Sequence, residues 1–258
     1  MSESLPQLFT GTRILVCRPH ADAEPLANAL SATGASVHCL PCLEIVPIEP
    51  DSTQRQYIID LDQYSHVLVT SQYAAQPMLE WIDTYWPQLP VGQQWFGIGR
   101  KTSAVLEQFG LSVHKNRRDL DSEALLKLPE LQDLREKKVL LVKGKNGRQV
   151  LQQELSNRSA RVDTLELYER RRPSYGKEQL RQALNEFRPN WVICLSAETI
   201  ENLHGYAREI DYDIQVAKVI VPSKRVAQVA KSLGFKLTYV TDKLMPIDII
   251  RCLKNARD

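Results

Sequence analysis

A basic, glycine-containing turn in the middle of the chain is the first segment whose residues could do chemistry. Residues 141–150 read LVKGKNGRQV, an apolar run followed by bases and glycines. A strand, a loop of this kind and a helix, in that order, are typical of sites that hold an anion on backbone N–H groups at a helix N-terminus. Lys143, Gly144 and Arg148 are therefore candidate anion ligands.

The pattern does not predict a nucleotide site. The turn matches neither GxGxxG nor GxxxxGK[ST], the patterns of nucleotide-binding loops. The equivalent turn near the N-terminus, RPHADAE over 18–24, has no glycine. Both turns share only a base at the end of a predicted strand, Arg18 or Lys143, beside a predicted helix start.

Hydroxyl groups lie at other predicted helix starts. They are Ser71 with its counterpart Ser196, and Thr102 with Ser223 in the matching turn of the other copy. Each could be only a helix N-cap, a position that Ser and Thr favour. Together with the bases and backbone N–H groups, they predict a cleft between two domains that suits a ligand with several carboxylates.

These turns belong to an internal repeat. ILVCR over 14–18 matches VLLVK over 139–143 (139 − 14 = 125), and HVLVTS over 66–71 matches WVICLS over 191–196 (191 − 66 = 125). The register then slips by one residue, so that Gly99 to Gly110 corresponds to Ser223 to Gly234. A repeat of this length indicates two copies of one domain rather than an array of short units.

Short β-branched runs alternate with amphipathic helical patterns in both copies. The predicted strands are 13–18, 35–39, 66–70, 94–98, 111–115, 138–143, 160–164, 190–195, 217–221 and 236–240, and the clearest helices are 22–33, 101–109, 146–157 and 224–233. Helix C-caps are expected at Gly34, Gly110 and Gly234. The alternation predicts two doubly wound, flavodoxin-like α/β domains with parallel sheets, whose ligands bind beyond the strand C-termini.

Two long extended segments complicate a tandem arrangement. They are VHCLPCLEIVPIEP over 37–50 and VDTLELYERRRP over 162–173. The first would reach roughly 45 Å at about 3.3 Å per residue, too far for one small domain. We expect both to cross between the domains and to pair as a two-stranded β-ladder. One domain would then hold 1–38 and 174–258 and the other 51–160, with 39–50 and 161–173 as linkers. A tandem split near residue 125 is the alternative.

Composition limits the classes of partner. The net charge is +2, from 33 basic and 31 acidic residues, which gives no reason to expect nucleic acid. No apolar run approaches the roughly 20 residues that span a bilayer, and residues 1–11 lack signal-peptide features, so we expect a cytoplasmic protein without a membrane partner. The five cysteines are scattered. Cys39 and Cys42 have redox or metal spacing, but no second CxxC or histidine cluster supports it, and packing is the preferred interpretation.

The chain carries five short motifs, which are in order Arg18-Pro19, Thr70-Ser71, Gly99 to Thr102, Asp121-Ser122-Glu123 and LYER over 167–170. Their order and spacing resemble the uroporphyrinogen-III synthase family, and the similarity runs from Arg13 to about residue 255. The chain departs from the family pattern at Cys17, Tyr73, Leu195 and 223–226.

The resemblance implies a lyase that acts in a cleft between two α/β domains. Its substrate would be hydroxymethylbilane, a linear tetrapyrrole with eight carboxylates. Loss of water gives an azafulvene cation, which passes through a spiro intermediate and closes with ring D inverted. The same cation closes spontaneously without inversion, so the main task is positioning. No metal or organic cofactor is implied, and we expect a monomer.

Tyr168 is the candidate proton donor to the leaving hydroxyl, with a packing role in the ladder as the alternative. The expected substrate-binding residues are Arg18, Ser71, Thr102, Ser122, Lys143, Gly144, Arg148, Ser196 and Ser223. The alternative function is a two-domain binding protein that closes on a small polyanion without chemistry. A nucleotide-sugar transferase would need a diphosphate loop, which the turns lack.

Overall fold

A computed structural model describes residues 8–114, 122–147 and 149–256 of the protein. The strands are β1 (Arg13–Val16), β2 (Ser36–Cys39), β3 (Glu44–Pro47), β4 (His66–Val69), β5 (Gln94–Gly97), β6 (Val113–His114), β7 (Lys138–Gly144), β8 (Arg161–Arg171), β9 (Trp191–Ile193), β10 (Lys218–Val221) and β11 (Thr238–Val240). The helices are α1 (His20–Ser31), α2 (Ser52–Ile59), α3 (Gln72–Tyr85), α4 (Arg100–Gln108), α5 (Ser122–Leu125), α6 (Val150–Asn157), α7 (Lys177–Arg181), α8 (Ala197–Glu209), α9 (Lys224–Ser232) and α10 (Pro246–Asn255). Each of the ten predicted strands and four predicted helices has its counterpart.

The chain divides into two compact units. The first unit holds Met1–Glu44 and Arg171–Asp258, and the second holds Ile45–Arg170. The sheet of the first unit has the order β11-β10-β9-β1-β2, and that of the second has the order β3-β8-β7-β4-β5-β6. Thus β1 pairs with β9, and its repeat counterpart β7 pairs with β4. The first unit combines β1 and β2 of the first repeat with β9, β10 and β11 of the second repeat. The second unit combines β7 and β8 of the second repeat with β4, β5 and β6 of the first repeat.

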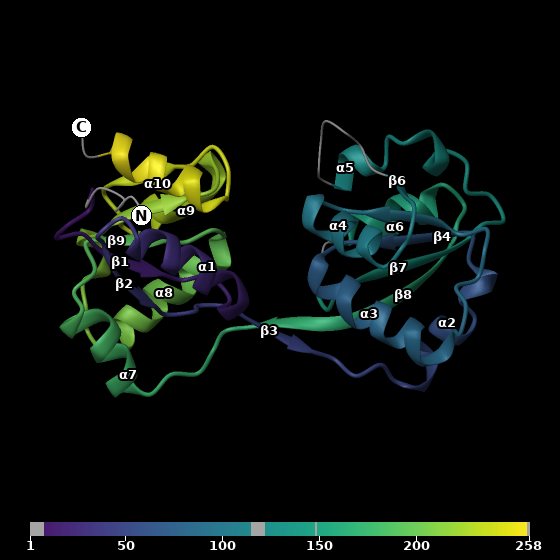
Figure 1. The fold of residues 1–258 in the computed structure, drawn as a ribbon, viewed down its shortest axis with the longest axis horizontal. Coiled ribbons are helices and arrows are strands. Elements are labelled where there is room, and N and C mark those ends of the chain that lie inside the picture. Colours follow the sequence, from purple (N-terminus) through teal and green to yellow (C-terminus); the bar gives the residue numbers. More distant parts are fainter. Residues whose placement is uncertain (1–7, 115–121, 148, 257–258) are drawn as a thin grey trace, which may run out of the picture. The chain divides into compact units, whose positions relative to one another are not determined.

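Both sheets have the doubly wound topology that the sequence predicted. The strand pairs β1–β2, β1–β9, β9–β10 and β10–β11 are parallel, as are β4–β5, β4–β7, β5–β6 and β7–β8. Helices cover the two faces of each sheet (Figure 1). The strand order reverses between β1 and β9 in the first unit and between β4 and β7 in the second. Ligands of such folds bind at these switch points, beyond the strand C-termini.

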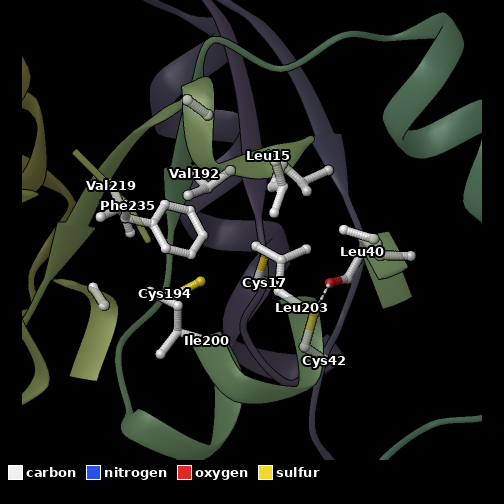
Figure 2. Packing of buried hydrophobic residues seen from close by; sticks show 14 of the residues in the cluster. Leu15, Cys17, Leu40, Cys42, Val192, Cys194, Ile200, Leu203, Val219 and Phe235 are labelled. Atoms are coloured by element: carbon white, nitrogen blue, oxygen red, sulfur yellow. Dashed lines mark hydrogen bonds between the residues drawn. The ribbon is translucent and has the colours of Figure 1, made fainter. Parts of the chain in front are cut away.

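Alternating strand residues build the core of the first unit. Leu15 and Val192 face α8 and α9, whereas Ile14 and Val16 face α1 and α10. Figure 2 shows Cys17, Cys42 and Cys194 within the first of these two layers, among leucine and valine side chains. All five cysteines are free.

The CxxC motif does not form a paired site. Cys39 is exposed, whereas Cys42 is fully buried and its thiol donates to the carbonyl of Leu40 (3.3 Å). Among the residues that the structure describes, no group of three or more His, Cys, Asp or Glu side chains could hold a metal ion. Cys42 therefore serves packing.

The second unit follows the same alternation. Val67 and Val69 of β4 pack with α2, α3 and α4, whereas Leu68 packs with α5 and α6 on the opposite face. The predicted C-cap glycines, Gly34, Gly110 and Gly234, all have positive φ (86°, 93° and 93°). This conformation suits glycine and ends a helix sharply, which confirms the cap prediction.

The two crossing segments differ from each other. β8 is continuous over Arg161–Arg171, as expected, but the first segment is interrupted between Cys39 and Glu44. Pro41 lies in this gap and has no N–H for a ladder hydrogen bond, so the prediction of an unbroken extended segment is wrong there. β3 is the neighbour of β8, and the N–H of Ile48 donates to the carbonyl of Leu167 (2.9 Å). The ladder therefore forms, as the edge of the second unit's sheet.

Candidate functional site

Ser71 and Tyr168 meet at the switch point of the second unit. Ser71 follows β4 and is the N-cap of α3, where its oxygen accepts the N–H of Ala74 (3.3 Å). The same hydroxyl donates to the phenolic oxygen of Tyr168 on β8 (3.0 Å). A serine has a single O–H, so this bond uses the acceptor side of Tyr168 and leaves its own proton for another acceptor.

Gly144 provides the surface on which the Tyr168 ring lies. The β7–β8 register shifts between Lys143 and Gly144, which brings Gly144 opposite Tyr168. A Cβ at Gly144 would come within 2.5 Å of the ring atom Cζ of Tyr168. The N–H of Lys145 donates to the carbonyl of Tyr168 (2.7 Å), and the ring of Tyr73 meets the phenol edge-on at 5.8 Å. Tyr168 is 5% exposed and well held.

Lys143 is buried and already paired. It is 7% exposed, and its Nζ lies 3.5 Å from a carboxylate oxygen of Glu166. A ligand carboxylate would therefore have to share this ammonium group with Glu166. Lys145 is more exposed and lies 3.8 Å from Glu169.

Thr102 does not start its helix. It is the third residue of α4, 2% exposed, and the N-cap is Gly99 with φ 84°. Gly99 and Ser223 are therefore equivalent N-caps, as the repeat predicted, whereas the prediction that the Thr102 hydroxyl lies at a helix start is wrong. Gly99 has no side chain, so no hydroxyl or carboxylate caps α4 from its N-cap position.

Two of the predicted binding residues, Ser122 and Arg148, lie wholly or partly outside the described residues. Ser122 is the first residue of α5, but its side chain lies outside the described part of the chain. Arg148 lies outside the described residues.

In the first unit, the candidate residues follow adjacent parallel strands. Arg18, Ser196 and Ser223 come after β1, β9 and β10, so they share the carboxyl-end edge of the sheet, and the first two flank its switch point. The Arg18 guanidinium lies 3.6 Å from the carboxylate of Asp22. The topology thus places these three residues at the same edge of the sheet.

Both serines are also helix N-caps. Ser196 accepts the N–H of Thr199 (3.1 Å), and Ser223 accepts the N–H of Val226 (3.4 Å). The hydroxyl of Ser196 is also hydrogen-bonded to that of Thr199 (2.7 Å). Capping accounts for their residue type, and any contact with a ligand comes in addition to it.

A cavity of about 610 Å³ lies beside Tyr168 within the second unit. Its lining residues come from β3, α3, α4, β8 and the segment after β3, and they are Ile45, Pro47, Ile48, Glu49, Gln72, Tyr73, Gln76, Pro77, Glu80, Trp81, Val105, Leu167 and Tyr168. The sequence analysis missed this cavity. The sequence pattern that could have indicated the cavity is a four-residue spacing within α3. This spacing places Tyr73, Pro77 and Trp81 along one face of the helix, and Gln72, Gln76 and Glu80 along a neighbouring one.

No helix within the described ranges combines the length and apolar character that crossing a membrane requires.

A family model described as uroporphyrinogen-III synthase HemD matches residues 24–247. The chain belongs to the uroporphyrinogen-III synthase family. The prediction from the motif order is thereby confirmed.

Relatives support the membership along nearly the whole chain. Uroporphyrinogen-III synthase of Escherichia coli (strain K12) is 28% identical over 250 residues, which cover 93% of this chain and 99% of that protein. The enzyme of Salmonella typhimurium (strain LT2) is 28% identical over 249 residues, with the same two shares.

Solved structures of the uroporphyrinogen-III synthase family share the fold. A mutant uroporphyrinogen III synthase of Thermus thermophilus is 18% identical, covers 95% of this chain and 98% of its own, and has a TM-score of 0.64. Uroporphyrinogen-III synthetase of Helicobacter pylori 26695 is 14% identical, with the same coverage and a TM-score of 0.58. The two-domain α/β prediction is therefore confirmed.

Proposed function

We propose that this chain is a lyase of tetrapyrrole biosynthesis that cyclises hydroxymethylbilane to uroporphyrinogen III, with loss of water and inversion of ring D. The match to the family over residues 24–247 carries the proposal. Two α/β units, each with polar residues and helix N-termini beyond its strand C-termini, are suited to a substrate with eight carboxylates.

Tyr168 is the proposed proton donor. Its oxygen accepts from Ser71, so its own O–H is available to the hydroxyl that leaves the substrate. Ser71 caps α3, and the partial positive charge at a helix N-terminus favours the negative charge that develops on the phenol. A positioned proton donor typically contributes about 10²–10⁴ in rate.

Binding of the carboxylates is proposed to be distributed over many groups. Backbone N–H groups at helix starts bind carboxylates whatever the local side chain, and the proposed binding side chains supplement them. Those side chains and the backbone position among them are Arg18, Ser71, Thr102, Ser122, Lys143, Gly144, Arg148, Ser196 and Ser223. Because Ser71, Ser196 and Ser223 are N-caps, each also holds its helix start in place.

We further propose that the protein is a monomer and acts in the cytoplasm. We propose that it requires no metal or organic cofactor and binds neither nucleic acid nor a membrane. The five free cysteines suit a reducing compartment. The chemistry needs only proton transfer and positioning, since the reaction neither oxidises nor reduces the substrate.

An isomer assay tests the function. Hydroxymethylbilane is generated freshly, the protein is added with or without a chelator, and the type I and type III isomers are separated. We expect type III product in both conditions. Unchanged spontaneous type I product, with the substrate bound, would instead establish a binding protein that performs no chemistry.

A further inference from the structure

The cavity beside Tyr168 has aromatic and apolar walls. Tyr73 and Tyr168 contribute two rings that meet at 62°, and Ile45, Ile48 and Leu167 add aliphatic surface. Its volume of about 610 Å³ falls within the range of roughly 300–1,000 Å³ in which proteins enclose drug-sized ligands. Walls of this kind suit a flat ring.

The charged residues that line this cavity are acidic, and one base, Arg55, packs on the lining residue Trp81 with its guanidinium carbon 5.3 Å from the ring centroid. Glu49 and Glu80 line the cavity, and none of its described lining residues is a lysine or arginine. The Glu80 carboxylate accepts from the amide of Gln76 (3.1 Å), which also lines the cavity. A carboxylate of the substrate is electrostatically disfavoured here, whereas a delocalised cation is favoured.

We infer that this cavity holds the pyrrole ring that loses water and stabilises the cation formed from it. The inference rests on the proposed function. Tyr168 gives its proton to the hydroxymethyl oxygen, the carbon–oxygen bond breaks, and its electron pair leaves with water. The pyrrole nitrogen supplies electrons to the exposed carbon, which gives the azafulvene cation and a Tyr168 phenolate. The proton released when ring D of the closed macrocycle regains its pyrrole aromaticity returns to Tyr168.

The cation then lies among ring faces and carboxylates instead of water. Cation–π contacts and nearby negative charge stabilise it more than the neutral ground state, so they lower the barrier to water loss. Tyr73 supplies a ring next to the donor, and Glu80 supplies charge at a longer range. Both are therefore assigned to the step that forms the cation, whereas the acidic side chains of the substrate bind outside this cavity.

Variants of α3 test the assignment in the full-length protein. Tyr73→Leu should lower kcat for type III formation about three- to thirtyfold with little change in KM, since cation–π contacts have that strength. Tyr73→Phe keeps the ring and should restore most of kcat. Glu80→Gln should lower kcat about two- to fivefold, and the loss should shrink at high salt because exposed charges are screened.

Matched controls lie on the same helix outside the cavity. Tyr85→Leu removes another partly exposed ring, which reaches the cavity only through its stacking on Trp81 (centroids 5.7 Å apart), so it should change kcat less than Tyr73→Leu. Asp83→Asn removes another exposed carboxylate and should leave kcat unchanged. Circular dichroism and thermal unfolding establish that each variant is folded. Equal kcat for Tyr73→Leu and Tyr85→Leu would overturn the inference, as would a rise in KM alone. The wild-type isomer assay decides the proposed function separately, because a type III synthase without this subsite would still pass it.

Discussion

Gly144 lies directly against the ring of Tyr168. A methyl group at this glycine would come within 2.5 Å of Cζ and within 2.9 Å of both Cε atoms of the ring. Real Cβ atoms do not approach other atoms so closely, so the ring could stay in place only without a side chain at 144. The absence of a side chain at Gly144 thus leaves room for the Tyr168 ring to pack there, a role distinct from anion binding.

The first prediction follows from this contact. Gly144→Ala should displace the Tyr168 ring from Ser71 and lower type III formation about tenfold or more, within the range of a lost proton donor. Overpacking should also lower the free energy of unfolding by about 1–3 kcal/mol. Steady-state kinetics and urea unfolding measure the two effects.

Gly176→Ala is the matched control for the Gly144 substitution. Gly176 has φ −69°, and the nearest atom to its added Cβ would be 3.7 Å away, so a methyl group fits. If Gly144→Ala kept full activity while Tyr168→Phe was impaired, the active position of the Tyr168 ring would not depend on a glycine at 144.

The second prediction concerns distributed binding. Single substitutions should each lower type III formation modestly, about tenfold, because many groups share the carboxylates, and Tyr168→Phe should cost most, about 10² or less. The positions to replace by alanine are Arg18, Ser71, Thr102, Lys143, Arg148, Tyr168 and Ser196. A loss of about 10⁴ or more at one position, in folded protein, would reveal a dedicated catalytic group and contradict the distributed scheme.

The third prediction is a pH dependence of stability. His66 is 4% exposed, with Nδ1 2.8 Å from the hydroxyl of Ser65 and Nε2 3.2 Å from the carbonyl of Glu130. Since a carbonyl only accepts, Nε2 carries the proton in the neutral ring, and Nδ1 lies beside the Ser65 hydroxyl, which also donates to the carbonyl of Lys138 (3.2 Å). Burial lowers the pKa of His66 below its ordinary value of 6.5.

A lowered pKa means that the unfolded chain binds the proton more readily. The stabilisation by neutral His66 is therefore complete above pH 6.5 and is lost as the pH falls below this value. Urea unfolding between pH 8 and pH 5 should show this decline. His66→Gln should weaken the dependence, whereas His20→Gln at an exposed site should keep it. An identical decline in both variants would assign the effect to other groups.

The fourth prediction concerns thiol reactivity. Burial raises the pKa of the Cys17 and Cys194 thiols well above 9.0 and also raises that of Cys42. Alkylation requires an accessible thiolate, so these three should react with iodoacetamide only after denaturation. Cys39 is exposed and should be labelled first in native protein. Mass spectrometry of partly labelled protein gives the order, and early labelling of Cys17 would contradict the buried cluster.

The fifth prediction concerns which fragments fold. Residues 45–170 hold every strand of the second sheet except the first residue of β3 and the last residue of β8, and they should unfold cooperatively on their own. Residues 1–125 should not, because β1 loses its partner β9 and β4 loses its partner β7. Circular dichroism in urea compares the two. The fragment 51–160, proposed from sequence, lacks β8 and is the less stable choice. Cooperative folding of 1–125 would favour a tandem arrangement.

The sequence by itself determined the elements, their parallel order and the family. Strand and helix patterns depend on alternating burial within a short segment, so runs such as 66–70 and 138–143 indicated β4 and β7 correctly. Gly110 and Gly234 ended helices where expected, since a positive φ is a local requirement. The repeat also marked which strand ends carry bases and hydroxyls, because topology places these ends at the switch points.

Only the tertiary structure decided what those residues touch. Ser71 and Tyr168 are 97 positions apart, and their hydrogen bond depends on a register shift beside Gly144 that no local pattern encodes. Thr102 became a buried residue within a helix, although its hydroxyl suggested a cap. The cavity beside Tyr168 depends on β3, α3, α4 and β8 packing together. Contacts between distant segments depend on how whole elements pack, and short-range periodicity carries no information about them.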